Sequence, residues 1–173
     1  MTNFEQTKTL VKEITMAQGG HNPQLFAFTE KGVALLILDD LPSDHDQKVF
    51  LFRLAGAKLA NSTGTEQINE LHFVSEAWFS IQKNEQEFIQ PSQDPDKKEA
   101  IIIVGKDYQN NTSNMSNLEM IRDTAGKLIE LKDTGNDEEQ SFESPLLDAF
   151  KQGFEEARDK KLLPKGTLGA TIN

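Results

Sequence analysis

The sequence predicts an α+β fold: a single domain with a mainly antiparallel sheet of about five or six strands and three helices packed against it. Two observations predict this class. Apolar residues recur at helical spacing near both ends of the 173-residue chain and in one segment between them. Short alternating or continuous apolar runs, bounded by turn residues, account for the strands. Residues 1–160 are expected to form the domain, and residues 161–173 a loosely ordered tail.

Residues 3–17 are predicted to form the first helix. Their apolar positions recur at helical spacing, and Gly19-Gly20 supplies a stop signal. Two strands follow at residues 25–29 and 33–38, joined by a short turn. Because the second of these runs is apolar on both sides, we expect it to be an interior strand of the sheet.

The next helix is predicted to begin near Ser43, which follows Pro42. Asp46 stands three residues later, so the pattern resembles a capping box with Asp in place of Glu or Gln. The helix runs to about Ala60 and is apolar nearly all round, so we expect it to pack against the sheet. The acidic stretch 39–46 lacks the frame of a Ca²⁺ loop, and acids in a first helical turn complement the helix dipole, so no metal site is expected there.

The second half of the chain supplies the remaining strands and the last helix. Strands are predicted at residues 68–81, 100–104, 118–122 and 128–131, the last two as a hairpin. The last helix is expected to begin at Ser144, with Pro145 in its first turn. The inner stripe of this helix consists of Leu146, Leu147, Phe150, Phe154 and Ala157.

Two resemblances follow from these patterns. The predicted order, helix, two strands, helix, four strands, helix, is similar to the roadblock/longin and profilin-like group of small domains, many of which dimerise or serve as scaffolds. This first resemblance concerns topology alone. The stretches "SEAW" (75–78), "PSQDPDKKEAIIIVG" (91–105) and "IRDTAGKLIEL" (121–131) resemble a group of small bacterial and phage-associated proteins of unknown function. The second resemblance covers residues 22–131 and implies no activity.

Composition excludes several classes of function. The chain has no cysteine, which rules out disulfides, thiolate metal sites and a cysteine nucleophile. A net charge of −10 repels phosphate backbones, so no nucleic-acid partner is expected. No apolar run approaches the roughly 20 residues that span a bilayer, and the first residues lack the apolar core of a signal peptide, so we expect a cytoplasmic protein without a membrane partner. No metal, phosphate-binding or nucleophile-elbow motif occurs, and no cofactor is expected.

The candidate binding site surrounds the connection 82–98, which is longer than the roughly 12–15 residues of most structureless loops. Asp94-Pro95-Asp96 is a turn signal within it. Trp78 either fills an edge of the core or anchors a partner. The candidate residues are Glu76, Trp78, Asp94, Asp96, Lys98 and Glu99.

Glu76 has two candidate partners if the flanking strands pair antiparallel. A Glu76–Lys98 ion pair would be structural. A Glu76–Glu99 carboxylate pair, with one raised pKa, would suit general acid–base catalysis or a divalent cation. We expect Glu76 to be paired or half-solvated, on the strand face away from Phe73 and Phe79.

Three functions stay open. The leading prediction is a non-enzymatic binding or assembly module, a homo-oligomer (a homodimer above all) or the partner of another protein, that presents the 82–98 loop. The first alternative is a hydrolase or isomerase in which Glu76 acts with Glu99, Asp96 or His72, which requires these side chains to meet in one concave pocket. The second alternative is a phage or mobile-element structural component, which would form a ring or filament.

Overall fold

The computed structural model describes residues 1–80, 93–134 and 144–162, with side chains described up to residue 160. It confirms the α+β class, the order of the elements and the antiparallel sheet. The elements are α1 (Asn3–Gln18), β1 (Gln24–Thr29), β2 (Gly32–Ile37), α2 (His45–Thr63), β3 (Ile68–Phe79), β4 (Lys98–Asp107), β5 (Thr112–Arg122), β6 (Leu128–Asp133) and α3 (Pro145–Leu162). None of the helices in the described ranges is both long and apolar enough to cross a membrane.

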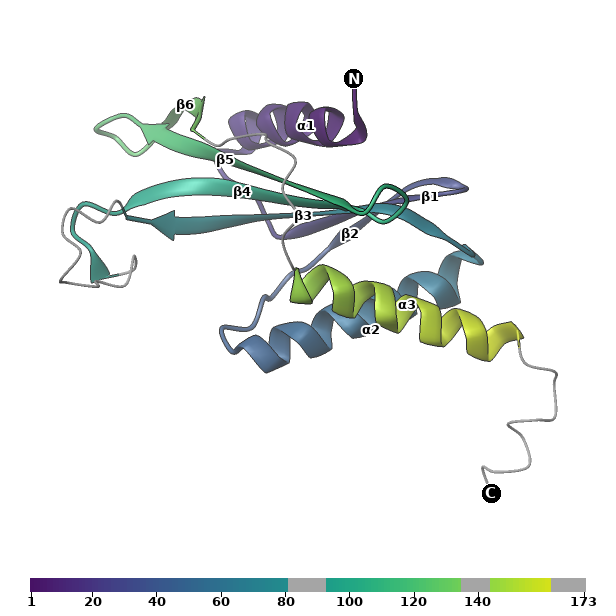
Figure 1. The fold of residues 1–173 in the computed structure, drawn as a ribbon. Coiled ribbons are helices and arrows are strands. Elements are labelled where there is room, and N and C mark those ends of the chain that lie inside the picture. The colour runs from purple at the N-terminus through teal and green to yellow at the C-terminus, as the bar shows by residue number, and fades with distance from the viewer. Residues whose placement is uncertain (81–92, 135–143, 163–173) are drawn as a thin grey trace.

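The sheet separates two layers of helix. Its strand order is β2-β1-β3-β4-β5-β6, and all neighbours are antiparallel. Figure 1 shows α1 on one face of the sheet and the paired helices α2 and α3 on the other. Because side chains alternate between the faces of a strand, each face has its own core. The core under α1 includes Val11, Phe26, Val74 and Ile101, and the core under α2 and α3 includes Leu25, Phe52, Leu71, Phe150 and Phe154.

Polar contacts fix α1 along its whole length. The helix begins after Thr2, whose side chain accepts a hydrogen bond from the N–H of Glu5, and it ends at Gly19, whose φ of 75° suits a left-handed cap. In between, the buried Lys8 forms an ion pair with Asp133 of β6 at 2.5 Å. These contacts place α1 over the β3–β6 part of the sheet and leave β2 outside its cover.

α2 and α3 are in close contact because a glycine stands at each side of their crossing. A Cβ atom on Gly56 would overlap the backbone oxygen of Phe150, and a Cβ atom on Gly153 would overlap the backbone oxygen of Arg53.

α2 begins one residue later than predicted. Asp44, not Ser43, is its N-cap, and the Asp44 side chain accepts a hydrogen bond from the N–H of Gln47 at 2.9 Å. This contact gives Asp44, and Asp46 in the first turn, the helix-start role that the sequence favoured.

The prediction that residues 33–38 form an interior strand is wrong. β2 pairs with β1 alone and is an edge strand. Ala34 and Leu36 pack against the core, but Val33, Leu35 and Ile37 on the other side are exposed. The composition of β2 is therefore typical of a strand buried on both faces, but in this fold only one face of it is covered.

The two edges of the sheet differ in chemistry. β6, the opposite edge, has three charged residues among its six: Glu130, Lys132 and Asp133. Charges of this kind prevent a free edge from pairing with another chain. β2 has no charged residue, no proline and, in its pairing with β1, no bulge. By these criteria β6 is a protected edge and β2 is an unprotected one.

Other strand predictions need smaller corrections. β4 and β5 extend beyond the predicted 100–104 and 118–122, because polar residues at their ends also pair in the sheet. The first two residues of the predicted tail, 161 and 162, belong to α3, and the rest of it lies outside the described residues.

Candidate functional site

The structure gives Glu76 a backbone partner. One of its carboxylate oxygens accepts the N–H of His21 at 2.6 Å, just after the end of α1. Gly20 leaves room for this contact, since a Cβ there would lie 2.8 Å from the same oxygen. Glu76 is exposed and lies on the sheet face opposite Phe73. Its observed role is to fasten the turn that follows α1 to the sheet.

The expected Glu76–Lys98 pair does not form. Lys98 lies opposite Phe79 in the register, so its side chain is on the other face of the sheet from Glu76. There it forms an ion pair with Glu119 at 2.9 Å. Lys98 was predicted in the 82–98 connection, ahead of a strand at 100–104, but it is the first residue of β4, and a shift of one residue along a strand changes the face.

Glu99 does share a sheet face with Glu76, but its carboxylate is bound by Arg122. The guanidinium donates to the two Glu99 oxygens at 2.7 and 2.9 Å and also to the carbonyl oxygen of Gly19 at 3.1 Å. Arg122 was not among the candidate residues. It belongs to a different strand, 23 residues from Glu99, and only the register of β4 and β5 brings the two together.

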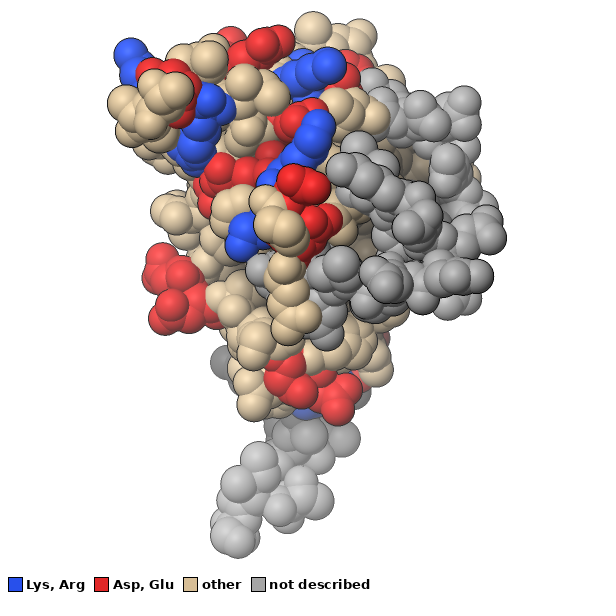
Figure 2. All heavy atoms as spheres, turned by 90° about the vertical axis from the view of Figure 1, so that its left-hand side faces the viewer, with Lys and Arg blue, Asp and Glu red and all other residues tan. Residues whose placement is uncertain are grey.

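The remaining candidate residues lie near the end of β3. Asp94 accepts the N–H of Asp96 at 2.8 Å, which is the turn that the sequence predicted. Trp78 is half-exposed, and the Lys97 ammonium lies 4.6 Å from its ring centre. On this side of the molecule acidic and basic side chains are intermixed rather than grouped by sign (Figure 2). Residues 82–92 of the predicted loop lie outside the described residues.

Glu76→Ala is expected to lower the free energy of unfolding by about 1–2 kcal/mol, because the His21 N–H loses its acceptor. Glu76→Gln keeps an oxygen at that position and should restore part of the loss. Urea unfolding at neutral pH measures both. The matched control is Glu130→Ala, since Glu130 is an exposed glutamate on β6. A Glu76→Ala variant as stable as the Glu130→Ala control would contradict this assignment.

His72, the third proposed partner of Glu76, is bound elsewhere. Its ring nitrogens lie 2.7 Å from the Thr7 hydroxyl and 2.6 Å from a Glu70 oxygen. Hydroxyl, imidazole and carboxylate in this order resemble a nucleophilic triad, in which the nucleophile must face the substrate. Here Thr7 and His72 are both buried. The network therefore fixes α1 to β3.

His21 predicts a pH dependence of stability. It is buried between the end of α1 and β1, and this burial lowers its pKa below the ordinary 6.5. The unfolded chain therefore binds the proton more tightly than the folded chain, so stability is retained above about pH 6.5 and falls as the pH drops below it. The loss of unfolding free energy between about pH 7.5 and 5.5 should be smaller in His21→Gln than in the wild type. The exposed His45, changed to Gln, is the control; equal losses in all three proteins would refute the assignment.

Among the residues that the structure describes, exposed large apolar side chains occur on β2 and on the outer side of α2. Val33, Leu35 and Ile37 project from β2, and Phe50 and Leu54 from α2. These five side chains are between 50% and 62% exposed; the three of β2 lie on the sheet face that carries α1, and the two of α2 lie on the opposite side. We call them, together with the groove between β2 and α2, the edge surface.

The groove of the edge surface has a volume of about 550 Å³. Its apolar walls include Ala34 and Leu36 from β2 and Leu51, Leu54 and Leu59 from α2. One wall is thus a strand with a free backbone edge and the other is a helix with aliphatic side chains. This combination suits a polypeptide that adds a strand to the sheet and packs side chains on the helix.

The two ends of the groove carry opposite charge. The Lys31 ammonium donates to the carbonyl oxygen of Gly64 at 2.8 Å, so the start of β2 lies beside the end of α2. Lys58 lines the groove near this end. Asp39 and Asp40 line it at the opposite end, where the chain leaves β2 for α2. The edge surface is therefore basic at one end and acidic at the other.

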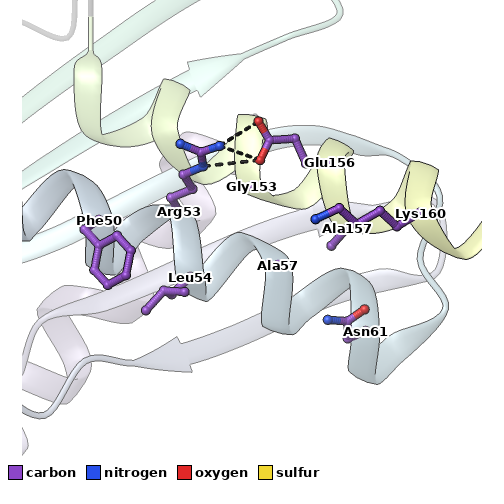
Figure 3. A pocket seen from close by; sticks show the side chains of 9 residues that line it. All are labelled: Phe50, Arg53, Leu54, Ala57, Asn61, Gly153, Glu156, Ala157 and Lys160. Carbon is purple, nitrogen blue, oxygen red and sulfur yellow. Dashed lines mark hydrogen bonds and ion pairs between the residues drawn. The ribbon is translucent and has the colours of Figure 1, made fainter. Parts of the chain in front are cut away.

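A second, smaller groove of about 400 Å³ lies between α2 and α3 and continues the edge surface. In Figure 3, Arg53 reaches toward Glu156 of α3, whereas Phe50 and Leu54 project from α2 on the opposite side. Arg53 and Glu156 form hydrogen bonds of 2.7 and 2.8 Å. The ion pair ties the two helices together and leaves the apolar stripe of α2 free.

Sequence reasoning missed the edge surface, although its signal was present. The continuous apolarity of residues 33–38 and of the second helix was interpreted as burial within the chain. The same signal is produced by burial against another chain.

Comparison of the chain with protein-family models, with curated proteins and with solved structures finds no match.

Proposed function

We propose that the protein is a non-enzymatic assembly module, which binds another polypeptide through the edge surface. The observation that carries this proposal is the position of β2, which is apolar on both sides, and of α2, which is apolar nearly all round. β2 and α2 lie side by side, and each exposes its outer apolar side at the same margin of the domain. Exposed apolar surfaces of this kind mark sites where a protein interacts with other molecules.

Contacts elsewhere support the same proposal. Glu76, Glu99 and His72 are three of the four residues of the alternative enzymatic function, the fourth being Asp96. Each is bound to a group of the chain itself, Glu76 to the His21 N–H, Glu99 to Arg122, and His72 to Thr7 and Glu70. These contacts secure α1, which gives all three residues a structural role.

The experiment compares the wild type with the double variant Phe50→Ser/Leu54→Ser. Native mass spectrometry of the purified protein should show the wild type in a complex heavier than the 19.4 kDa chain, and the variant at the mass of the single chain. At high dilution the variant should unfold within about 1 kcal/mol of the wild type, because exposed side chains contribute little to folding.

The matched control is Leu10→Ser/Met16→Ser, which removes two exposed apolar side chains from α1. It should leave the complex intact. A wild type that carries no second polypeptide at any concentration contradicts the proposal, and so does a complex that survives the loss of Phe50 and Leu54.

A further inference from the structure

We propose that the edge surface binds a second copy of this chain, with the two β2 strands antiparallel and Leu35 of each copy opposite Leu35 of the other. The inference rests on the proposed function and names its partner. It predicts a continuous sheet of twelve strands, twice the six of one copy. A two-fold axis perpendicular to the sheet would pass between the two Leu35 residues.

The backbone of β2 is oriented for this pairing. The N–H of Leu38 donates to the carbonyl oxygen of Pro23 at 2.8 Å, so even-numbered residues of this segment direct their polar groups toward β1. Val33, Leu35 and Ile37 therefore direct their N–H and C=O groups outward, to the free edge. In the proposed register Leu35 meets Leu35, and Val33 meets Ile37 of the second copy. Each of these pairs can exchange two backbone hydrogen bonds.

The distribution of apolar side chains selects this register. With Leu35 at the axis, all of residues 33–37 lie opposite residues 33–37 of the second copy. A shift that moved the axis to Ala34 would set Ile37 against Lys31, and a shift to Leu36 would set Val33 against Asp39. An axis between two residues would place the helices of the two copies on opposite faces. The apolar stretch is thus centred on Leu35.

The charges at the two ends favour a second copy over an unrelated partner. Continued past the ends of β2, the same register brings Lys31, in the turn before the strand, opposite Asp39 of the second copy, once on each side of the axis; the Lys31 ammonium has donors besides the one it gives to the Gly64 carbonyl. Lys58, at the basic end of one groove, approaches the acidic end of the other, with its Asp40. A surface that is basic at one end and acidic at the other is complementary to its own two-fold image.

Glu30 would lie opposite Asp40 in this register, but its carboxylate is directed elsewhere. It accepts the N–H groups of Glu66 and Gln67 at 2.8 and 3.1 Å, just before β3 begins. The acidic side chain beside Lys31 is thus bound within its own copy.

Single cysteines test the register directly, because the chain has none of its own. Residues paired in this way have Cα atoms about 5.5 Å apart, within the range of a disulfide. Under mild oxidation Leu35→Cys should form a covalent dimer. Val33→Cys alone should form no covalent dimer, since the two Val33 positions would lie roughly 13 Å apart. When the Val33→Cys and Ile37→Cys proteins are mixed, a disulfide should form between them. Ile129→Cys, on the exposed face of the charged edge strand β6, is the control for random collision and should stay monomeric.

A charge exchange tests the partner in the native protein. Lys31→Asp and Asp39→Lys should each raise the dissociation constant of the dimer about tenfold, because each creates two like-charge pairs. The double variant Lys31→Asp/Asp39→Lys should restore most of the affinity. Sedimentation velocity over a range of concentrations measures all four proteins.

The outcomes separate this inference from the proposed function. A dimer that does not link through Leu35→Cys, or in which the double charge variant stays weak, overturns the register. A complex with a different polypeptide at the edge surface overturns the second copy as partner, while the proposed function stands. A chain that is monomeric and without a bound polypeptide overturns both.

Discussion

Gly56→Ala is expected to lower the free energy of unfolding by about 3 kcal/mol or more. The new methyl group would overlap the backbone oxygen of Phe150, which cannot move away as a flexible side chain could. α2 and α3 must then separate, and Phe150 and Phe154, both buried between α3 and the sheet, lose contacts. Chemical denaturation with detection by circular dichroism measures the loss.

The sign of this effect is diagnostic, because alanine is the better residue in a free helix by about 1 kcal/mol. Gly153→Ala, at the reciprocal contact with Arg53, should be destabilising to a similar degree. Asn61→Ala, an exposed position on α2, is the control and should change little. A stabilised Gly56→Ala variant would show that the helices do not approach one another as described.

Phe52→Ala is expected to cost about 3–5 kcal/mol of unfolding free energy. Phe52 is fully buried, and its ring meets that of Phe73 edge to face with centres 5.0 Å apart. Phe50, two residues earlier on the same helix, is an exposed residue of the edge surface. Phe50→Ala should therefore stay within about 0.5 kcal/mol of the wild type when measured at high dilution.

The pair of variants separates folding from association on one helix. Phe52→Ala should reduce stability at every protein concentration, whereas Phe50→Ala should weaken the complex and leave the single chain intact. Thermal unfolding at several concentrations, followed by fluorescence of Trp78, distinguishes the two. Equal destabilisation of the diluted chain by both variants would mean that Phe50 belongs to the core.

The fold could be predicted from sequence because its elements carry local signals. Helical periodicity with Gly19 at one helix end and Pro145 at the start of another located the helices. Apolar runs located the strands, although β4 and β5 proved longer than their apolar centres. The ends of these strands were missed because their residues are polar. Such residues still form backbone hydrogen bonds with the neighbouring strand, but the pattern of apolar side chains does not reveal those bonds.

The order of strands in the sheet could not be derived in this way. The segment that forms β2 reads as interior because its side chains are apolar on both sides, yet β3 pairs on the far side of β1. A continuous apolar pattern indicates that the side chains are buried, but it does not indicate whether they are buried by the same chain or by another one. The mistaken interior assignment is thus the reason to consider a second copy at this edge.

The candidate site was only partly predictable for a related reason. Glu76 and Glu99 do share a sheet face, as the expected pairing implied. Their actual partners, the N–H of His21 and the guanidinium of Arg122, come from segments distant in sequence. Spacing along the chain gave no indication of either contact, since both depend on the register of strands and on where α1 ends.

The mass in solution of the wild type and of Leu35→Lys tests the central claim most directly. Sedimentation equilibrium should give the wild type twice the 19.4 kDa of one chain. It should give Leu35→Lys the mass of one chain, with an unchanged circular dichroism spectrum, because two lysines would face each other at the axis. Equal masses for the two proteins, whether one chain or two, would contradict the account.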